Sequence, residues 1–237
     1  MGIKYNVNEN YFDSWSHEMA YVLGFWYADG SLENSLYIRG QYIRVSSTDS
    51  SIIQAIKRSL ESEHKIVIAK QDPPRKSSFL LRIGSHYLYK AMTKHGLYPK
   101  KSLTMTMPNI PRKYLASFTR GYFDGDGCVY LEKSNGKTCD CIVKRLNVIF
   151  TCGSELFIEQ LSNMLHSAYN VSCSTVCFNQ RAYRVRYSTR DSIRLFNVMY
   201  ASPCDIYLHR KFNTFREYFA LRPKVVNPLI AHILQEL

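Results

Sequence analysis

The sequence lacks the features of a membrane, secreted or disulfide-bonded protein. No run in its 237 residues approaches the roughly 20 consecutive apolar residues that span a bilayer, and the polar start, Met1–Asn10, is not a signal peptide. Seven cysteines are scattered along the chain, and neither Cys139/Cys141 nor Cys173/Cys177 has the spacing of a zinc site. We interpret them as reduced thiols, and these two pairs as small buried hydrophobic residues. We therefore expect an intracellular protein in a reducing compartment, in the cytoplasm, the nucleoid or an organelle matrix, with no membrane partner.

Acidic residues are scarce. The chain has 19 Asp and Glu against 31 Lys and Arg, which gives a formal net charge of +12. The excess is spread over both halves, and residues 160–190 contain no acidic residue at all. The 46% hydrophobic content excludes a disordered basic tail. A basic folded chain of this kind favours a nucleic-acid partner, and no zinc-deaminase, P-loop or nucleophile-elbow signature competes with that interpretation.

The sequence contains an internal repeat. Tyr21–Ser31 aligns with Phe118–Cys128 at an offset of 97 residues, so that Asp29 matches Asp126. Three further pairs of segments match in the same order: Ser46–Leu60 with Thr151–Leu165, Phe79–Ile83 with Tyr183–Tyr187, and Lys100–Ser102 with Arg210–Phe212. The repeat predicts two copies of one domain, residues 1–107 and 108–237, joined by a linker at about 105–111.

Each copy is predicted to run helix, strand pair, helix, strand pair, helix. In the first copy we expect a helix from Ser14 or Ser16 to about Ala28, strands at 36–38 and 42–46, and a helix at 50–60. In the second copy we expect a helix with Pro111 in its first turn that ends near Gly125. Strands at 128–131 and 146–150, a helix at 154–168 and a capping helix after Pro228 follow.

The first helix of each copy has a stripe of small side chains. Within each stripe the small residues are four positions apart. They are Ala20, Gly24 and Ala28 in one copy and Ser117, Gly121 and Gly125 in the other. Small residues let two helix backbones approach closely, so we expect Ala20, Gly24, Ser117 and Gly121 to form a helix interface.

Each stripe ends one residue before an aspartate. Packing the stripes together places Asp29 and Asp126 side by side at the negative ends of both helix dipoles. At least one pKa should then rise, and a divalent cation such as Mg²⁺ would relieve the repulsion. The alternative is that each Asp-Gly merely begins a turn after a helix.

The two repeated helices carry a known pattern. Val22-Leu-Gly-Phe-Trp-Tyr-Ala-Asp-Gly30 and Thr119-Arg-Gly-Tyr-Phe-Asp-Gly-Asp-Gly127 resemble the paired motifs of monomeric LAGLIDADG homing endonucleases. The first motif departs from the family in having Tyr27 where an acid is frequent and where the second has Asp124. The resemblance implies an α+β fold of two pseudo-twofold related αββαββα domains. Their four-stranded antiparallel sheets would form a saddle that binds double-stranded DNA.

The resemblance also implies the site and its reaction. Asp29 and Asp126 would be the catalytic, metal-binding acids, with the main-chain carbonyls of Ala28 and Gly125 as further metal ligands. Lys101 and Lys211 would be the basic residues near the active site, where they stabilise the transition state or order the attacking water; the alternative is a plain surface lysine. Two or more Mg²⁺ ions would support hydrolysis of both strands and leave short 3′ overhangs. We expect Mn²⁺ to substitute, and Ca²⁺ to support binding without cleavage.

Two other functions of the same fold stay open. One is an intron maturase that binds RNA, and the other is a DNA-binding regulator that does not cleave. The presence of both aspartates and both lysines argues against each, because a pure binder does not need two carboxylates beside a phosphate. We see no splicing domain in the sequence, so we expect a free-standing, monomeric protein encoded by an intron or another mobile element rather than an intein.

Strand alternation selects the candidate DNA contacts. If Ile38, Ile43 and Val45 face the core, the side chains that face DNA in the first copy are Tyr37, Arg39, Tyr42, Arg44 and Ser46, with Arg82 on a later strand. The corresponding candidates in the second copy are Asn179, Gln180, Arg181, Arg184 and Arg186. Arg75 and Lys76 are candidate backbone contacts in a loop. Each of these side chains is alternatively an ordinary solvated residue. Because the copies differ at nearly all of these positions, we expect an asymmetric target.

Overall fold

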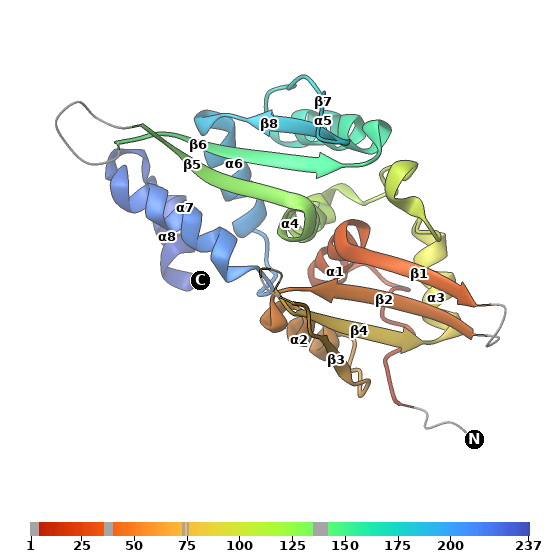
Figure 1. The fold of residues 1–237 in the computed structure, drawn as a ribbon. Helices are drawn as coiled ribbons and strands as arrows, with labels where there is room; N and C mark the ends of the chain where they lie inside the picture. The colour runs from red at the N-terminus through yellow and green to blue at the C-terminus, as the bar shows by residue number, and fades with distance from the viewer. Residues whose placement is uncertain (1–4, 36–39, 73, 75, 135–141) are drawn as a thin grey trace.

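The chain forms two halves with the same order of elements (Figure 1). The computed structural model describes residues 5–35, 40–72, 74, 76–134 and 142–237. The first half comprises α1 (His17–Asp29), β1 (Gly30–Ser35), β2 (Gly40–Ser47), α2 (Ser50–Ser59), β3 (Ile66–Ala69), β4 (Ser78–Gly84) and α3 (His86–Lys94). The second comprises α4 (Leu115–Asp126), β5 (Gly127–Ser134), β6 (Ile142–Cys152), α5 (Glu155–Tyr169), β7 (Cys177–Asn179), β8 (Ala182–Tyr187) and α6 (Thr189–Tyr200). The predicted α+β fold with two αββαββα units is confirmed.

Two helices follow the second unit. They are α7 (His209–Leu221) and α8 (Pro228–Glu236), and short 3₁₀ turns lie at Lys101–Leu103, Arg112–Tyr114 and Pro223–Val225. The predicted helix after Pro228 is α8, which Asn227 caps through a hydrogen bond from the Ile230 N–H. The sequence did not predict α7, which carries Lys211.

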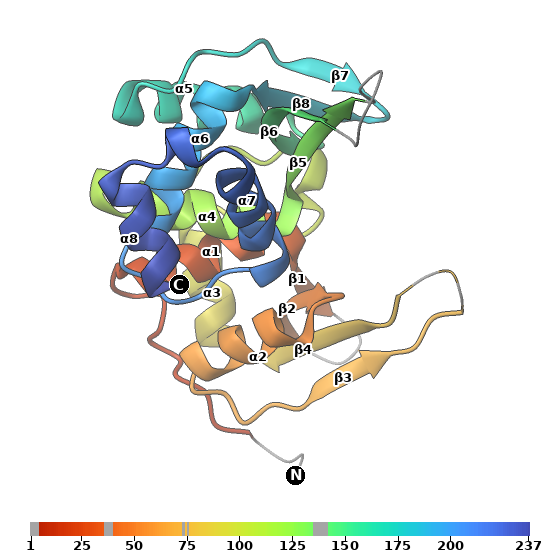
Figure 2. The same cartoon turned by 90° about the vertical axis from the view of Figure 1, so that its left-hand side faces the viewer.

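Each half contains a four-stranded antiparallel sheet, and the two sheets share one strand order. The orders are β1-β2-β4-β3 and β5-β6-β8-β7. Alternate side chains of β2, such as Ile43 and Val45, are buried, while Arg44 between them is exposed. The helices α2 and α3 pack on the buried face of the first sheet, and α5 and α6 on that of the second (Figure 2). The opposite face of each sheet carries polar side chains.

The pair α1 and α4 lies between the two sheets (Figures 1 and 2). A β-carbon on Gly24 would overlap the carbonyl oxygen of Phe118, and one on Gly121 would overlap that of Tyr21. Glycine at both positions therefore lets the two backbones touch. Because neighbours enclose it on all sides, α1 is buried continuously from Met19 to Tyr27.

Several local predictions hold and others need correction. The side chain of Ser16 caps α1, as predicted, and the side chains of Asp49 and Ser154 cap α2 and α5. Pro111 does not begin the repeated helix, because a 3₁₀ turn follows it and α4 starts only at Leu115.

The prediction that Cys173 and Cys177 are buried was wrong. Cys177 lies on the edge strand β7 and Cys173 in the segment before it, so that both are exposed, and each is a free thiol. Cys139 and Cys141 fall outside the described residues. None of the described helices is long and apolar enough to cross a bilayer.

Candidate active site

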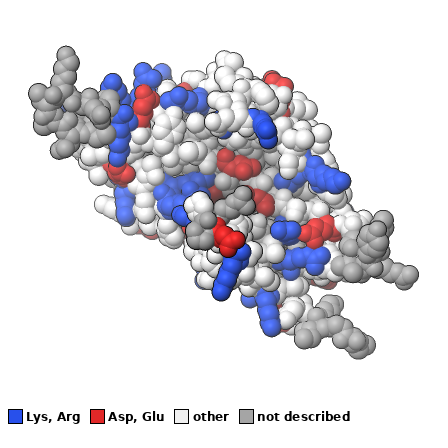
Figure 3. All heavy atoms as spheres, in the orientation of Figure 1, with Lys and Arg blue, Asp and Glu red and all other residues white. Residues whose placement is uncertain are grey.

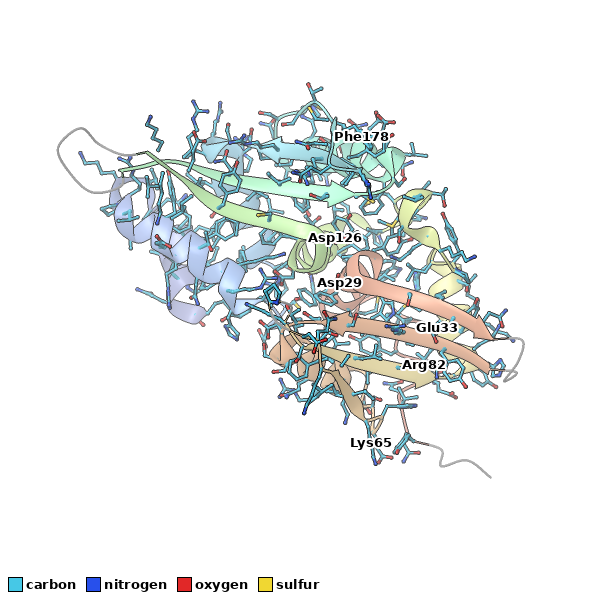
Figure 4. The ribbon with its side chains drawn as sticks, viewed as in Figure 1. Asp29, Glu33, Lys65, Arg82, Asp126 and Phe178 are labelled. Atoms are coloured by element: carbon cyan, nitrogen blue, oxygen red, sulfur yellow. The ribbon has the colours of Figure 1, made fainter. Side chains whose placement is uncertain are left out.

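The two repeated aspartates end the two central helices. Asp29 is the last residue of α1 and Asp126 the last of α4, and Figure 4 shows them near each other at the centre of one face of the molecule. A β-carbon on Gly125 would lie 3.3 Å from Oδ2 of Asp29, so the Asp29 carboxylate reaches over the end of the partner helix. Both aspartates are exposed. The acids are therefore accessible from the face that carries the outward sides of both sheets.

The protein around these acids disfavours their charged form. Partial burial raises the pKa of Asp29 to about 6, and the nearby Asp126 carboxylate adds to the rise. Partial loss of hydration also raises the pKa of Asp126, while Lys101 and Lys211 oppose that shift. Both pKa values thus rise, in line with the prediction that at least one would, but loss of hydration is the first cause for both acids, and repulsion by Asp126 is the second cause for Asp29. Within the part of the chain that the structure describes, we find no hydrogen bond to either carboxylate.

Two buried lysines hold the ends of the same helices. Lys101 Nζ donates to the main-chain oxygen of Tyr27 at 2.6 Å. Lys211 Nζ donates to the main-chain oxygens of Asp124 at 2.9 Å and Gly127 at 2.6 Å, and also to those of Phe123 and Gly125. Burial lowers the pKa of both amines, that of Lys211 to about 8. Each lysine thus satisfies carbonyls that a helix C-terminus leaves free, and each brings a cation close to the acids.

Asp124 is a buried residue whose role the sequence did not reveal. Its Oδ2 accepts hydrogen bonds from the Tyr21 hydroxyl at 2.7 Å and from the Leu208 N–H at 2.9 Å. Tyr21 belongs to α1 and Leu208 directly precedes α7, so one carboxylate ties α1, α4 and α7 together. The sequence feature that could have indicated this role is an acidic residue within a helix that is otherwise buried. Through this contact Asp124 helps to fix the start of the helix that carries Lys211.

The donor set at the helix ends fits a hard divalent cation. No group of three or more His, Cys, Asp or Glu residues in the described ranges could hold a metal by side chains alone. Asp29 and Asp126 would each supply carboxylate oxygen, and the remaining ligands would be carbonyl oxygen, water or a phosphate. Mg²⁺ is commonly bound in this way, through one or two carboxylates and substrate oxygens. Because none of the described residues donates a hydrogen bond to these two exposed carboxylates, their lone pairs can bind such an ion.

Comparison with known proteins agrees with this geometry. The family described as "LAGLIDADG-like domain" matches residues 113–198, which include α4 with Asp126. This segment, which covers about a third of the chain, is therefore similar to a LAGLIDADG-like domain. No curated protein matches the sequence.

Solved structures match over nearly the whole chain. The LAGLIDADG homing endonuclease I-LtrWI, bound to target DNA, matches with a TM-score of 0.58 and 12% identity over 96% of this chain and 97% of that one. The LAGLIDADG meganuclease I-CpaMI, bound to uncleaved DNA, matches with a TM-score of 0.57 and 16% identity over 94% and 97%. Variants of the homing endonuclease I-DmoI match with a TM-score of 0.56 and 18% identity over 88% and 99%. The whole chain therefore has the two-motif LAGLIDADG fold that its sequence predicted.

In this LAGLIDADG fold, the outward faces of both sheets flank the acids. Tyr42, Arg44, Ser46 and Arg82 lie on the outward face of the first sheet, and Arg184 and Arg186 on that of the second. Lys76 is exposed between β3 and β4, and Asn179, Gln180 and Arg181 are exposed at the turn between β7 and β8. Tyr37, Arg39 and Arg75 lie outside the described residues. Figure 3 shows acidic atoms at the centre of this face and lysine and arginine side chains around them.

The acidic partners of these arginines were not predicted from the sequence. Glu33 lies 2.7 Å from Nε of Arg82 and 3.3 Å from Arg44, and Glu132 lies 3.3 Å from Arg186. Strand alternation predicted that the arginines face outward. The strand that carries Glu33 begins earlier than predicted, however, and the strand that carries Glu132 extends further. The glutamates therefore had no place in the predicted face.

Proposed function

We propose that the chain is a site-specific double-strand DNA endonuclease that acts as a monomer on a long asymmetric target. One observation carries the proposal: Asp29 and Asp126 lie side by side and exposed, between two sheets whose outward faces present arginines. I-LtrWI and I-CpaMI, which share the fold, were solved on DNA. The net charge of +12 suits a polyanionic partner.

In this proposal the residues at the helix ends have distinct tasks. Asp29 and Asp126 bind the divalent ions, with the carbonyls of Ala28 and Gly125 as further ligands. When bound, Mg²⁺ would activate a water and stabilise the leaving 3′ oxygen on each strand, which leaves short 3′ overhangs. Lys101 and Lys211 hold positive charge beside the phosphates. Because carbonyl oxygens already fix both amines, these charges need no reorganisation when the transition state forms.

The two halves would each bind one half of the target. We assign residues 1–107 and 108–237 to the two domains, with the helix interface formed by Ala20, Gly24, Ser117 and Gly121. The proposed DNA contacts are Tyr37, Arg39, Tyr42, Arg44, Ser46, Arg75, Lys76 and Arg82 in the first domain and Asn179, Gln180, Arg181, Arg184 and Arg186 in the second. Arg44 and Ile149 occupy corresponding places on the two sheets, so the halves present different chemistry and would select different bases.

A randomised duplex library tests the function. The protein is incubated with the library in Mg²⁺, Mn²⁺ or Ca²⁺, and both the cut and the bound molecules are sequenced. We expect one long, non-palindromic sequence to be cut on both strands in Mg²⁺ or Mn²⁺ and bound uncut in Ca²⁺. Selective binding without cleavage in any of these ions would instead identify a regulator. Binding to folded intron RNA alone would identify a maturase.

A further inference from the structure

Arg82 and Arg186 occupy the same place on the two sheets. In the first sheet, Ser31, Arg44 and Arg82 lie side by side across β1, β2 and β4. In the second sheet, the equivalent row across β5, β6 and β8 is Cys128, Ile149 and Arg186. Each row begins two residues after the aspartate that ends the preceding helix. The two arginines are therefore related by the internal repeat and stand at matching places relative to Asp29 and Asp126, although the residues between them differ.

Arg82 is held in one orientation. Its Nε donates to Oε2 of Glu33 at 2.7 Å, and its guanidinium lies 3.5 Å from the centre of the Tyr42 ring. The other carboxylate oxygen of Glu33 accepts from Arg44 at 3.3 Å. Figure 4 shows Glu33 and Arg82 on the face that also carries the two aspartates. The hydrogen bond to the carboxylate and the contact with the aromatic ring limit the freedom that an exposed arginine otherwise has.

Arg186 is held in a related way by different residues. Its Nε donates to Oδ1 of Asn147 at 3.1 Å, and its Nη2 donates to Oε2 of Glu132 at 3.3 Å. The Tyr130 ring lies 5.6 Å below the guanidinium. In the row next to Arg82, the polar partner Glu33 lies on β1 and the aromatic partner Tyr42 on β2. In the second sheet the order is reversed, since the aromatic Tyr130 lies on β5 and the polar Asn147 on β6. In both halves the arginine thus donates through Nε to a polar side chain and lies near a tyrosine ring, although the partners differ.

These contacts leave other N–H donors of each guanidinium without a partner among the described residues. Of the five N–H donors of an arginine, Arg82 uses one and Arg186 two in the contacts above. The end-on pair of Nη donors is the group that binds O6 and N7 of guanine in the major groove. Stability alone does not explain the arrangement, because ion pairs this exposed contribute little to folding. Fixing an arginine before binding lowers the entropy cost of a directional contact.

We propose that Glu33 and Glu132 are specificity-determining positioning residues, which orient Arg82 and Arg186 to read a guanine at the same distance from the cleavage centre in each half of an otherwise asymmetric target. This inference rests on the proposed function and adds the chemistry that the target must have. It also separates these two arginines from the lysines and arginines of the loops, whose contacts to phosphates carry no sequence information.

The test measures base preference rather than activity alone. Duplexes cut by the wild type in Mg²⁺ are sequenced, and the same selection is repeated with Arg82→Ala, Arg186→Ala, Glu33→Gln and Glu132→Gln. Affinity for a random duplex and the melting temperature are measured for each variant. Arg194→Ala is the matched control, because this arginine also pairs with an acid, Asp191, but lies on the helix α6.

We expect one guanine in each half-site at equal distances from the centre of the cut, preferred over other bases by about 10- to 100-fold. Arg82→Ala should abolish the preference in one half only, and Arg186→Ala in the other. Glu33→Gln should reduce discrimination at the Arg82 position, while affinity for random DNA stays equal or rises because a negative charge is gone. Arg194→Ala should leave the whole profile unchanged.

Two results would overturn the inference while leaving the proposed function intact. One is cleavage of a defined target that has no guanine at matching positions. The other is a Glu33→Gln variant that binds every duplex more weakly and melts at a lower temperature, as a purely structural residue would. A wild-type protein that neither binds nor cuts any duplex would refute the proposed function itself.

Discussion

Gly24 packs against the main chain of Phe118 with no side chain between the two helices, and a methyl group on Gly24 would overlap the Phe118 carbonyl oxygen. We therefore expect Gly24→Ala to force α1 and α4 apart and to lower the free energy of unfolding by about 2 kcal/mol or more. Urea denaturation measures the loss. Gln54→Ala on the exposed side of α2 is the control and should change stability by less than about 0.5 kcal/mol. A Gly24→Ala variant as stable as the control would refute the close helix contact.

Asp29 should weaken the fold at neutral pH. Its pKa rises from 3.8 to about 6 on folding, so its contribution to stability is fully present below about pH 4 and is lost as the pH rises through about 6. Asp29→Asn stays neutral throughout. We expect this variant to exceed the wild type by about 1 kcal/mol at pH 7.5 in metal-free buffer, a value reduced by solvent screening, and to match it near pH 4.

Added Mg²⁺ should reverse the order at pH 7.5. An ion bound by Asp29 and Asp126 stabilises the folded wild type, whereas Asp29→Asn has lost one of the two carboxylates. Urea unfolding at both pH values, with and without Mg²⁺, measures these effects. Equal stability of the two proteins at pH 7.5 without metal would contradict the raised pKa.

The two buried lysines should differ in their importance for stability. Lys211→Met leaves the carbonyls of Phe123, Asp124, Gly125 and Gly127 without their shared donor, whereas Lys101→Met affects the carbonyl of Tyr27. An unsatisfied buried carbonyl costs about 1–3 kcal/mol. We expect Lys211→Met to be the more destabilising variant in urea denaturation at pH 7.5. Equal losses would show that the extra carbonyls of α4 find other donors.

The parts of the fold that depend on local patterns could be predicted from the sequence. The repeat of Asp29 and Asp126 and the small residues at Gly24 and Gly121 predicted the helix pair, and alternation around Ile43 and Val45 predicted which face of β2 is buried. These features are periodic, and periodicity is visible in a sequence. The prediction that Pro111 lies in the first turn of the helix was wrong. Proline also favours the start of a 3₁₀ turn, and such a turn at 112–114 follows Pro111.

Contacts between distant segments could not be predicted in this way. The hydrogen bond from Tyr21 to Asp124 joins residues 103 positions apart, and that from Arg82 to Glu33 joins residues 49 apart. No spacing rule links such pairs, since only the packed fold brings them together. The hydrogen bonds from Lys211 to the carbonyls at the end of α4, such as that of Asp124, could not be predicted for the same reason, because they depend on how α7 packs against α4.

Binding to DNA should depend steeply on salt. With a net charge of +12 and lysines and arginines around the central acids, the logarithm of the affinity should fall linearly with the logarithm of the salt concentration. Titration of a labelled duplex in Ca²⁺ at several KCl concentrations measures the slope. Substituting the exposed Lys76 by Ala should reduce the slope by about one unit if this residue binds a phosphate. A flat salt response would contradict binding through the DNA backbone.

Asp29 and Asp126 should both be needed for DNA cleavage, and substituting each acid in turn tests this. Wild-type protein, Asp29→Asn and Asp126→Asn are compared on the duplex that the wild type selects, with cutting of each strand measured in Mg²⁺ and binding measured in Ca²⁺. We expect each substitution to abolish double-strand cutting while the variant still binds the duplex. Double-strand cutting by either variant at the wild-type rate would contradict this expectation.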